Sequence, residues 1–288
     1  YWELAIANAI TQSLGDEFTA PGPVHVNLPF AEPLVPSDAD TSWTAAIKSG
    51  ALQSPISVEP PELAPLLADM QIDATAPRGV VICSDPRSNR PATALAKLLQ
   101  WPMLVEAGGG PRAAEVAIQH YAKLLEQNEL QPDVIITCGR FGLSRAVAKF
   151  VTQFPQIAVG RYPLDADPTS HASHHVSQVP LPLHVGVAPS EWLEAWRAAD
   201  AAVNAEASDW SSSLVAKTLL ETCTANDLLY VAASMSVRIV DDLLTSENAP
   251  RVLVNRGANG IDGLVASATG AALVNEIGNT YLLIGDVA

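Results

Sequence analysis

Short apolar runs alternate along this chain with segments whose apolar residues recur at helical spacing. Continuous apolar runs bounded by polar or glycine-containing turns are typical of buried parallel strands. We predict strands at 24–28, 79–84, 103–105, 134–138, 156–159, 228–232, 252–254 and 281–284. We predict helices at 2–14, 91–99, 113–125, 144–150, 190–207, 213–222, 236–244 and 264–277. This alternation predicts an α/β fold, with parallel sheets that carry helices on both faces.

Two segments interrupt that rhythm. Residues 33–61 are rich in proline and weakly periodic, which is typical of a linker between domains. Residues 161–178 contain His171, His174 and His175, whose spacing leaves open a metal site. The surrounding prolines and hydroxyl residues favour a polar surface loop instead. In helix 190–207, Trp192 and Trp196 fall on one side and predict a buried stripe.

Composition narrows the classes of function. The 288 residues are enough for about two domains. Lys and Arg number 16 against 31 Asp and Glu, a formal charge of −15. That balance argues against nucleic acid or a membrane surface as partner, and an anionic substrate would need locally gathered arginines. Three widely spaced cysteines indicate buried thiols in a reducing cytoplasm. The chain opens within a helical pattern and without methionine, so we expect a piece of a longer protein.

The segment 255–263 contains three glycines between the strand at 252–254 and the helix at 264–277. Glycines let a backbone turn sharply or approach a ligand closely. Such a turn between strand and helix is where α/β folds place ligands. Arg256 within it would then hold an anion. The alternative, a tight connection with a surface arginine, stays equally open on spacing alone.

Three motifs resemble one known family. NRGANGIDG at 255–263, followed by LVASATG, is similar to the NRGxxGIDG…TAxG signature of the MenD family. GPVHVNLPFAEPL at 22–34 resembles that family's GPVHxNxPFxEPL, and SMSVR at 234–238 resembles its NSxxVR segment. This family comprises the thiamine-diphosphate-dependent 2-succinyl-5-enolpyruvyl-6-hydroxy-3-cyclohexene-1-carboxylate synthases of menaquinone biosynthesis.

The resemblance implies the fold of thiamine-diphosphate enzymes and a division into domains. Residues 1–36 would end a pyrimidine-binding domain, and 37–62 would form the linker. Residues 63–188 would form a complete middle domain with a Rossmann-like parallel sheet. Residues 189–288 would begin the diphosphate-binding domain. The middle domain lacks a G-x-G-x-x-G fingerprint, so we expect a bare scaffold there without flavin or nicotinamide.

The resemblance also implies the chemistry. The cofactors would be thiamine diphosphate and Mg²⁺ or Mn²⁺, and the substrates would be 2-oxoglutarate and isochorismate. After loss of CO₂ the succinyl unit would add to isochorismate. The protein would be a cytoplasmic homodimer or homotetramer. The activating glutamate and the last metal-binding asparagine would lie outside this chain. We therefore expect no catalytic residue within it and no activity from it alone.

The family's pattern assigns site residues by position. Ser234 matches a polar residue beside the cofactor, and Ile261 matches the apolar residue that holds the cofactor bent. Gly285 and Asp286 match the start of the metal motif, with Asp286 as the metal ligand. Arg238 and Arg256 match arginines that bind substrate carboxylates through a bidentate fork. From its place after a glycine turn, Arg145 is a further substrate-binding candidate.

Alternatives stay open at several of these residues. Arg238 can instead form a salt bridge on its own helix with Asp241 or Asp242, and Arg145 can be a solvated helix residue. The family usually has Gly-Asn where this chain has Ala232 and Ala233, which puts cofactor contacts in that turn in doubt. Rival functions are another 2-oxoacid thiamine enzyme, related to acetolactate synthase, and a non-catalytic scaffold or binding module.

Overall fold

The computed structural model describes residues 2–15, 20–26, 59–127, 130–161, 166–203, 210–245, 249–255 and 260–286. The chain divides into two compact units, Tyr1–Glu59 and Pro60–Ala288. In the first unit, α1 (Trp2–Leu14) confirms the helix predicted at 2–14. The strand predicted at 24–28 does not form at 24–26, because the described residues of this unit contain no strand with which it could share hydrogen bonds. Most of the predicted linker 37–62 lies outside the described residues.

The second unit contains a five-stranded parallel sheet in the order β2-β1-β3-β4-β5. Its strands are β1 (Gly79–Cys83), β2 (Met103–Val105), β3 (Val134–Cys138), β4 (Gln156–Val159) and β5 (His174–Val176). The helices around it are α3 (Leu63–Asp69), α4 (Pro86–Leu99), α5 (Tyr121–Gln127), α6 (Arg145–Val151) and α8 (Ser190–Ala201). This arrangement confirms the predicted α/β class with a parallel sheet.

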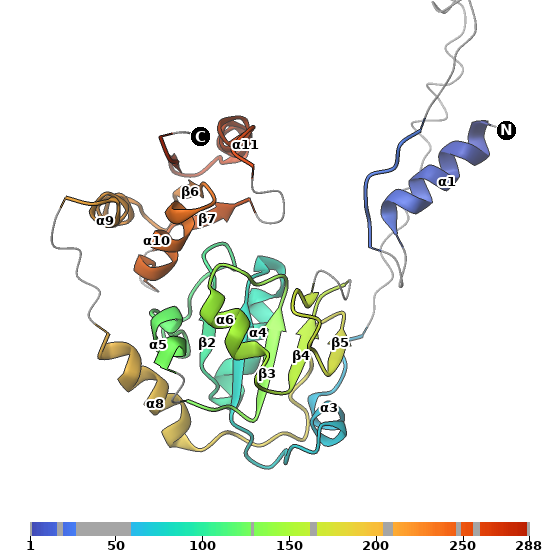
Figure 1. Cartoon of the computed structure of the whole chain (residues 1–288), viewed down its shortest axis with the longest axis vertical. Helices are drawn as coiled ribbons and strands as arrows, with labels where there is room; N and C mark the ends of the chain where they lie inside the picture. The colour runs from blue at the N-terminus through green and yellow to red at the C-terminus, as the bar shows by residue number, and fades with distance from the viewer. Residues whose placement is uncertain are drawn as a thin grey trace, which may run out of the picture. The chain divides into compact units, whose positions relative to one another are not determined.

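The order of the strands reverses between β1 and β3. From β1 the chain crosses through α4 to β2 on one side, and from β3 it crosses through α6 to β4 on the other. Because such crossovers are right-handed, the two helices lie on opposite faces of the sheet, as Figure 1 shows. Both faces are thus covered, which explains why every residue of β1, β2, β3 and β4 is buried.

Further predicted elements differ from the structure in the second unit. The helix predicted at 190–207 ends at Ala201. Helix α4 begins at Pro86 and not at 91, because the Asp85 side chain caps it by accepting from the Arg87 N–H. An N-cap aspartate followed by proline at the first helical position is a stronger start signal than Pro91.

The helix predicted at 113–125 forms only from Tyr121. The preceding backbone bonds to other elements instead: Met103 exchanges hydrogen bonds with Val116 and Ile118, and the Asp200 carboxylate accepts from the N–H groups of Gln119 and His120. Tertiary partners therefore override the helical periodicity of 113–120.

The loop predicted at 161–178 is wrong at 174–176. These residues form the edge strand β5, which pairs in parallel with β4. Alternating exposure of its side chains hides it from a search for apolar runs, because one face of an edge strand meets solvent.

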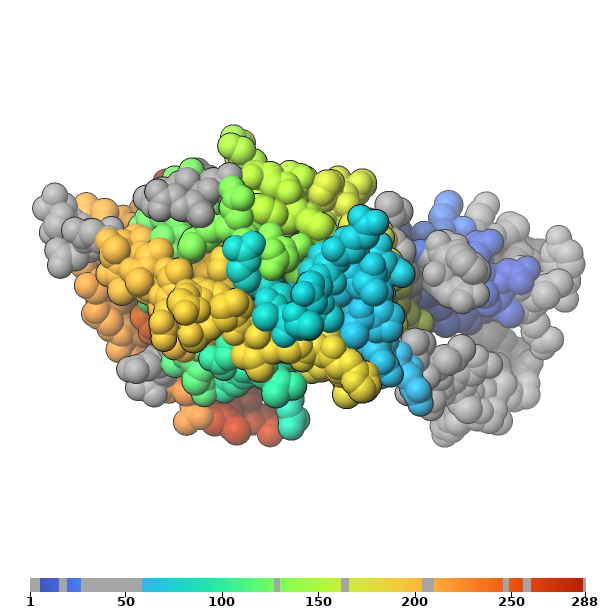
Figure 2. Space-filling model, turned by 90° about the horizontal axis from the view of Figure 1, so that it is seen from below, coloured from blue at the N-terminus to red at the C-terminus, as the bar shows by residue number. Residues whose placement is uncertain are grey.

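Helix α8 packs its inner face on the five-stranded sheet. Trp192 and Trp196 are buried in the same core as the strands, which confirms the predicted stripe. Trp192 also donates from its indole nitrogen to the Gly79 carbonyl oxygen at 2.9 Å. The outer face of α8 lies at the surface, in gold, in Figure 2. The domain boundary predicted at 188–189 stays a prediction.

A second parallel sheet has the order β7-β6-β8, formed by β6 (Leu228–Val231), β7 (Arg251–Val254) and β8 (Thr280–Leu283). It carries α9 (Ser212–Thr222), α10 (Met235–Leu243) and α11 (Leu264–Val274). These six elements confirm the sequence-based predictions to within a few residues at their ends.

Polar groups join the two sheets within the second unit. Asp241 of α10 is buried and accepts three hydrogen bonds, from the Ala107 N–H at 2.7 Å, Arg112 at 2.7 Å and the Tyr121 hydroxyl at 2.5 Å. Arg112 also donates to the Leu244 carbonyl at 2.7 Å. Burial raises the pKa of the Asp241 carboxyl, and the charge of Arg112 acts against that rise. A buried ion pair therefore fixes α10 to the loop after β2.

Apolar contacts reinforce this joint. Ala107 and Leu143 follow β2 and β3, yet both belong to the core cluster formed with Leu229, Val237 and Val240. The loops at the carboxyl edge of the five-stranded sheet thus pack against α10 and β6.

Candidate functional site

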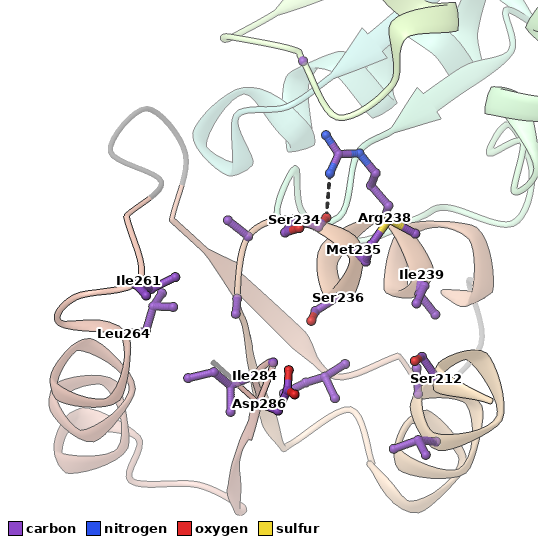
Figure 3. A pocket seen from close by; sticks show the side chains of 17 residues that line it. Ser212, Ser234, Met235, Ser236, Arg238, Ile239, Ile261, Leu264, Ile284 and Asp286 are labelled. Atoms are coloured by element: carbon purple, nitrogen blue, oxygen red, sulfur yellow. Dashed lines mark hydrogen bonds between the residues drawn. The ribbon is translucent and has the colours of Figure 1, made fainter. Parts of the chain in front are cut away.

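A cavity of about 870 Å³ lies at the carboxyl ends of β6 and β8. Ala232 to Ser236 form one wall where the chain leaves β6 for α10, and Leu283 to Asp286 form another where it leaves β8. Ile261 and Leu264 approach from the start of α11, and Ser212 from α9 (Figure 3). Because all three strands are parallel, their carboxyl ends meet at one edge, where α/β folds bind ligands.

Most of the residues predicted from the family's motifs lie around this one cavity. Its lining includes Ser234, Arg238, Ile261, Gly285 and Asp286. They come from three segments of the chain, and the parallel sheet brings these segments to one edge. Figure 3 shows Asp286 close to the carboxyl end of β8 and Ile261 facing the cavity from the side of α11.

Two predicted substrate ligands are placed differently. Arg256 lies outside the described residues. Arg145 is the first residue of α6, is exposed, and is not part of the cavity's lining. Gly142, three residues earlier, does line the cavity. The predicted contact of Arg145 with a substrate therefore stays a prediction.

Ser234 sits in an unusual backbone conformation at the start of α10, with φ of 72° and ψ of −131°. A positive φ is uncommon for a residue other than glycine. No side-chain hydrogen bond caps α10, so backbone N–H groups of its first turn lack the partner that a cap supplies. The start of a helix that faces a cavity favours a negatively charged ligand.

Arg238 reaches from α10 toward the loops of the five-stranded sheet. Its Nη1 donates to the Ser234 carbonyl oxygen at 2.7 Å, and its Nε donates to the Leu143 carbonyl oxygen at 3.2 Å. The alternative of a salt bridge on its own helix is wrong. Asp241 pairs with Arg112, and Asp242 lies 2.9 Å from Lys123 and 3.3 Å from His120.

Other lining residues were not predicted. Ser236 and Ile239 lie three residues apart on α10, so the spacing of the SMSVR helix contained a signal for both. Leu264 directly follows the glycine motif. Ser212 and Gly142 come from separate segments without a local signal, and only the tertiary structure brings them to the cavity.

The lining fits a ligand that is part apolar and part anionic. Aliphatic side chains of Ile239, Ile261 and Leu264 face hydroxyl groups of serines. The volume lies within the range of small-molecule sites, about 300–1,000 Å³. Asp286 is the one carboxylate in the described lining. Among the described residues, no cluster of three or more His, Cys, Asp or Glu side chains would hold a metal ion.

No helix in the described part of the chain is long and apolar enough to cross a membrane.

Comparison with known proteins identifies the family. No protein-family model matches the chain. The chain is 32% identical over its whole length to the 2-succinyl-5-enolpyruvyl-6-hydroxy-3-cyclohexene-1-carboxylate synthase of Thermobifida fusca, covering 54% of that protein. It is 29% identical over its whole length to the synthase of the same name from Kineococcus radiotolerans, and 31% identical over 94% of its length to that of a Nocardioides species, covering 52% of each. The chain thus spans about half the length of these relatives. Over that half, it belongs to the family of 2-succinyl-5-enolpyruvyl-6-hydroxy-3-cyclohexene-1-carboxylate synthases.

Proposed function

We propose that the natural protein containing this chain is a thiamine-diphosphate-dependent transferase of menaquinone biosynthesis. It decarboxylates 2-oxoglutarate and transfers the succinyl unit to isochorismate. The observation that carries this proposal is the cavity itself. Motif residues from three separate segments, predicted from the resemblance, lie around one opening at the carboxyl edge of a parallel sheet.

The lining supports a specific arrangement of the cofactor. Ser234 and the start of α10 would bind polar or anionic groups, and Ile261 would pack against the apolar ring system. Asp286, with the turn at Gly285, would hold Mg²⁺ or Mn²⁺ together with diphosphate oxygens. When bound, thiamine diphosphate supplies the electron sink for decarboxylation. The chain's own residues bind, orient and exclude water.

The negative charge of the chain and of the proposed substrates is the reason why we assign Arg238 to substrate binding. Both proposed substrates are anions, whereas the chain has a formal charge of −15. A local cation must therefore offset repulsion at the binding site. Arg238 is the one cationic side chain in the described lining, and no described residue accepts a hydrogen bond from its Nη2. Arg256 and Arg145 remain proposed as further carboxylate ligands.

The wider setting is also a proposal. The loops packed against α10 support a middle domain that serves as scaffold without flavin or nicotinamide. We propose the domain boundaries 1–36, 37–62, 63–188 and 189–288, a cytoplasmic location, and a homodimer or homotetramer that completes the site.

The test is an assay of the full-length natural protein with 2-oxoglutarate, isochorismate, thiamine diphosphate and Mg²⁺. We expect CO₂ release that depends on both the cofactor and the cation, and product formation that depends on isochorismate. Arg238→Ala should lower kcat/KM about ten- to a hundredfold, the effect of losing a hydrogen bond to a charged group.

The matched control is Arg251→Ala, because Arg251 is an exposed arginine at the opposite end of the same sheet. It should leave kcat/KM unchanged. Turnover of pyruvate in place of 2-oxoglutarate would favour an enzyme related to acetolactate synthase. Absence of any decarboxylation would favour a scaffold.

A further inference from the structure

A buried carboxylate, Glu106, lies directly after β2 and is 3% exposed. Its Oε1 accepts from the N–H groups of Gly142 at 2.9 Å and Leu143 at 2.8 Å. Its Oε2 accepts from the Ser84 hydroxyl at 2.9 Å. A buried carboxylate is costly unless such donors satisfy it. The sheet's own loops therefore supply three donors to one side chain.

The turn held by Glu106 reaches the cavity. Gly142 lines the cavity, and the Leu143 carbonyl oxygen accepts from Nε of Arg238 at 3.2 Å. A continuous series of contacts thus runs from Glu106 through Leu143 to Arg238, although these residues are far apart in the sequence. No motif or spacing in the sequence connects Glu106 with the site.

Glu106 and the apolar core fix Leu143 from two sides. Its N–H is bonded to the carboxylate, and its side chain is buried in the cluster with Val237 and Val240 of α10. With its N–H and side chain held, its carbonyl oxygen is restricted to one direction. The other hydrogen bond of Arg238 goes to the Ser234 carbonyl within its own helix. The Leu143 oxygen is therefore the contact that fixes the guanidinium relative to the five-stranded sheet.

We propose that Glu106 is a positioning residue: it holds the Gly142–Leu143 turn so that Arg238 presents its guanidinium to the substrate carboxylate. This inference rests on the proposed function, because it assigns Arg238 to substrate binding. Glu106 itself does not line the cavity, and by this proposal it does not touch the substrate.

The experiment uses Glu106→Ala and Glu106→Gln in the full-length natural protein. Glu106→Ala should raise the KM of the substrate held by Arg238 about ten- to a hundredfold, the range that misplacing a binding group costs. The kcat should change less. Glu106→Gln should restore most of the affinity, because its amide oxygen still accepts from both backbone N–H groups.

Asp167→Ala is the matched control. Asp167 is also 3% exposed, and it accepts from the N–H groups of Thr169 and Ala172 and from the Thr169 hydroxyl. None of these partners lines the cavity. Its loss should lower the melting temperature and leave both KM values unchanged. An equal rise in KM for Asp167→Ala would show that general destabilisation explains the effect, and would overturn the proposal.

Two further measurements separate positioning from other roles. In an Arg238→Ala background, Glu106→Ala should add no further rise in KM, since the effect passes through Arg238; full additivity would overturn the proposal. Hydrogen exchange at the amides of Gly142 and Leu143 should accelerate in Glu106→Ala and stay slow in Glu106→Gln. Unchanged exchange in Glu106→Ala would overturn it as well, with or without turnover. If the wild type shows no turnover but hydrogen exchange in the variants changes as expected, only the proposed function is rejected.

Discussion

The two sheets of the second unit differ in how fully they are covered. All residues of β1, β2, β3 and β4 in the five-stranded sheet are buried. In the three-stranded sheet only β6 is fully buried, and every residue of β7 and β8 is partly exposed. Helix α11 is apolar around its circumference, yet its Leu273 and Val274 are 82% and 76% exposed. The first sheet therefore has the larger share of the buried apolar surface that stabilises the fold.

The two sheets also differ at their carboxyl edges, where α/β folds bind ligands. Loops fill the carboxyl edge of the five-stranded sheet and bond to α10. The place where the strand order reverses, between β1 and β3, is therefore a contact surface for α10. The carboxyl edge of the three-stranded sheet is open and forms the cavity. Within one chain, the same fold class thus provides a closed contact surface in one region and, in the other, the cavity that we propose as the binding site.

The largest predicted effect concerns the core of the five-stranded sheet. Trp196→Ala should lower the free energy of unfolding by about 3–5 kcal/mol, because it leaves a cavity among fully buried side chains. Trp210→Ala is the control, since Trp210 is 88% exposed, and it should change stability by less than about 0.5 kcal/mol. Urea unfolding measures both. Similar losses in the two variants would contradict the comparison between buried and exposed apolar residues.

An intermediate effect is expected at the joint between the sheets. Tyr121→Phe removes the hydroxyl that donates to Asp241, and should cost about 1.5–3 kcal/mol because the acceptor is a buried charge. The measurement is urea unfolding followed separately by probes in each sheet. Tyr281→Phe in β8 is the control, because its hydroxyl has no hydrogen-bond partner among the described residues. If Tyr121→Phe leaves the unfolding midpoints of both sheets unchanged, the joint does not stabilise them.

The smallest predicted effect is a dependence of stability on pH, to which one carboxylate near each sheet contributes. Burial raises the pKa of Asp167, but hydrogen bonds from the Ala172 and Thr169 N–H groups outweigh it and leave a lowered pKa. Hydrogen bonds from the N–H groups of Asn279 and Thr224 lower the pKa of Asp227, before β6. A carboxyl group whose pKa is lowered by folding stabilises the folded state at pH values above its ordinary pKa, about 3.9. That stabilisation is lost as the pH falls through the pKa of the folded state.

We therefore expect the urea midpoint of the wild type to fall as the pH drops below about 4. Asp167→Asn and Asp227→Asn should each flatten this decline, the first in the five-stranded sheet and the second in the three-stranded sheet. Parallel pH profiles for the wild type and both variants would show that neither carboxylate contributes.

The strands could be predicted from the sequence because burial on both faces requires unbroken apolar runs, as in 79–83 and 134–138. Prediction failed where tertiary partners decided the local structure. Residues 113–120 have helical periodicity but bond to Met103 and Asp200. His174 to Val176 have no apolar run, and become a strand only because β4 offers an unpaired edge.

The candidate site divides in the same way. The sequence by itself determined the motifs, and through their resemblance it selected Ser234, Arg238, Ile261 and Asp286, because ligand chemistry restricts which residue types occupy such positions. Only the tertiary structure decided that Gly142 and Ser212 join them, that Asp241 pairs with Arg112 and not with Arg238, and that Glu106 holds the turn beside Arg238. These contacts link residues far apart in the chain, and local periodicity contains no information about partners that folding alone brings within hydrogen-bond distance.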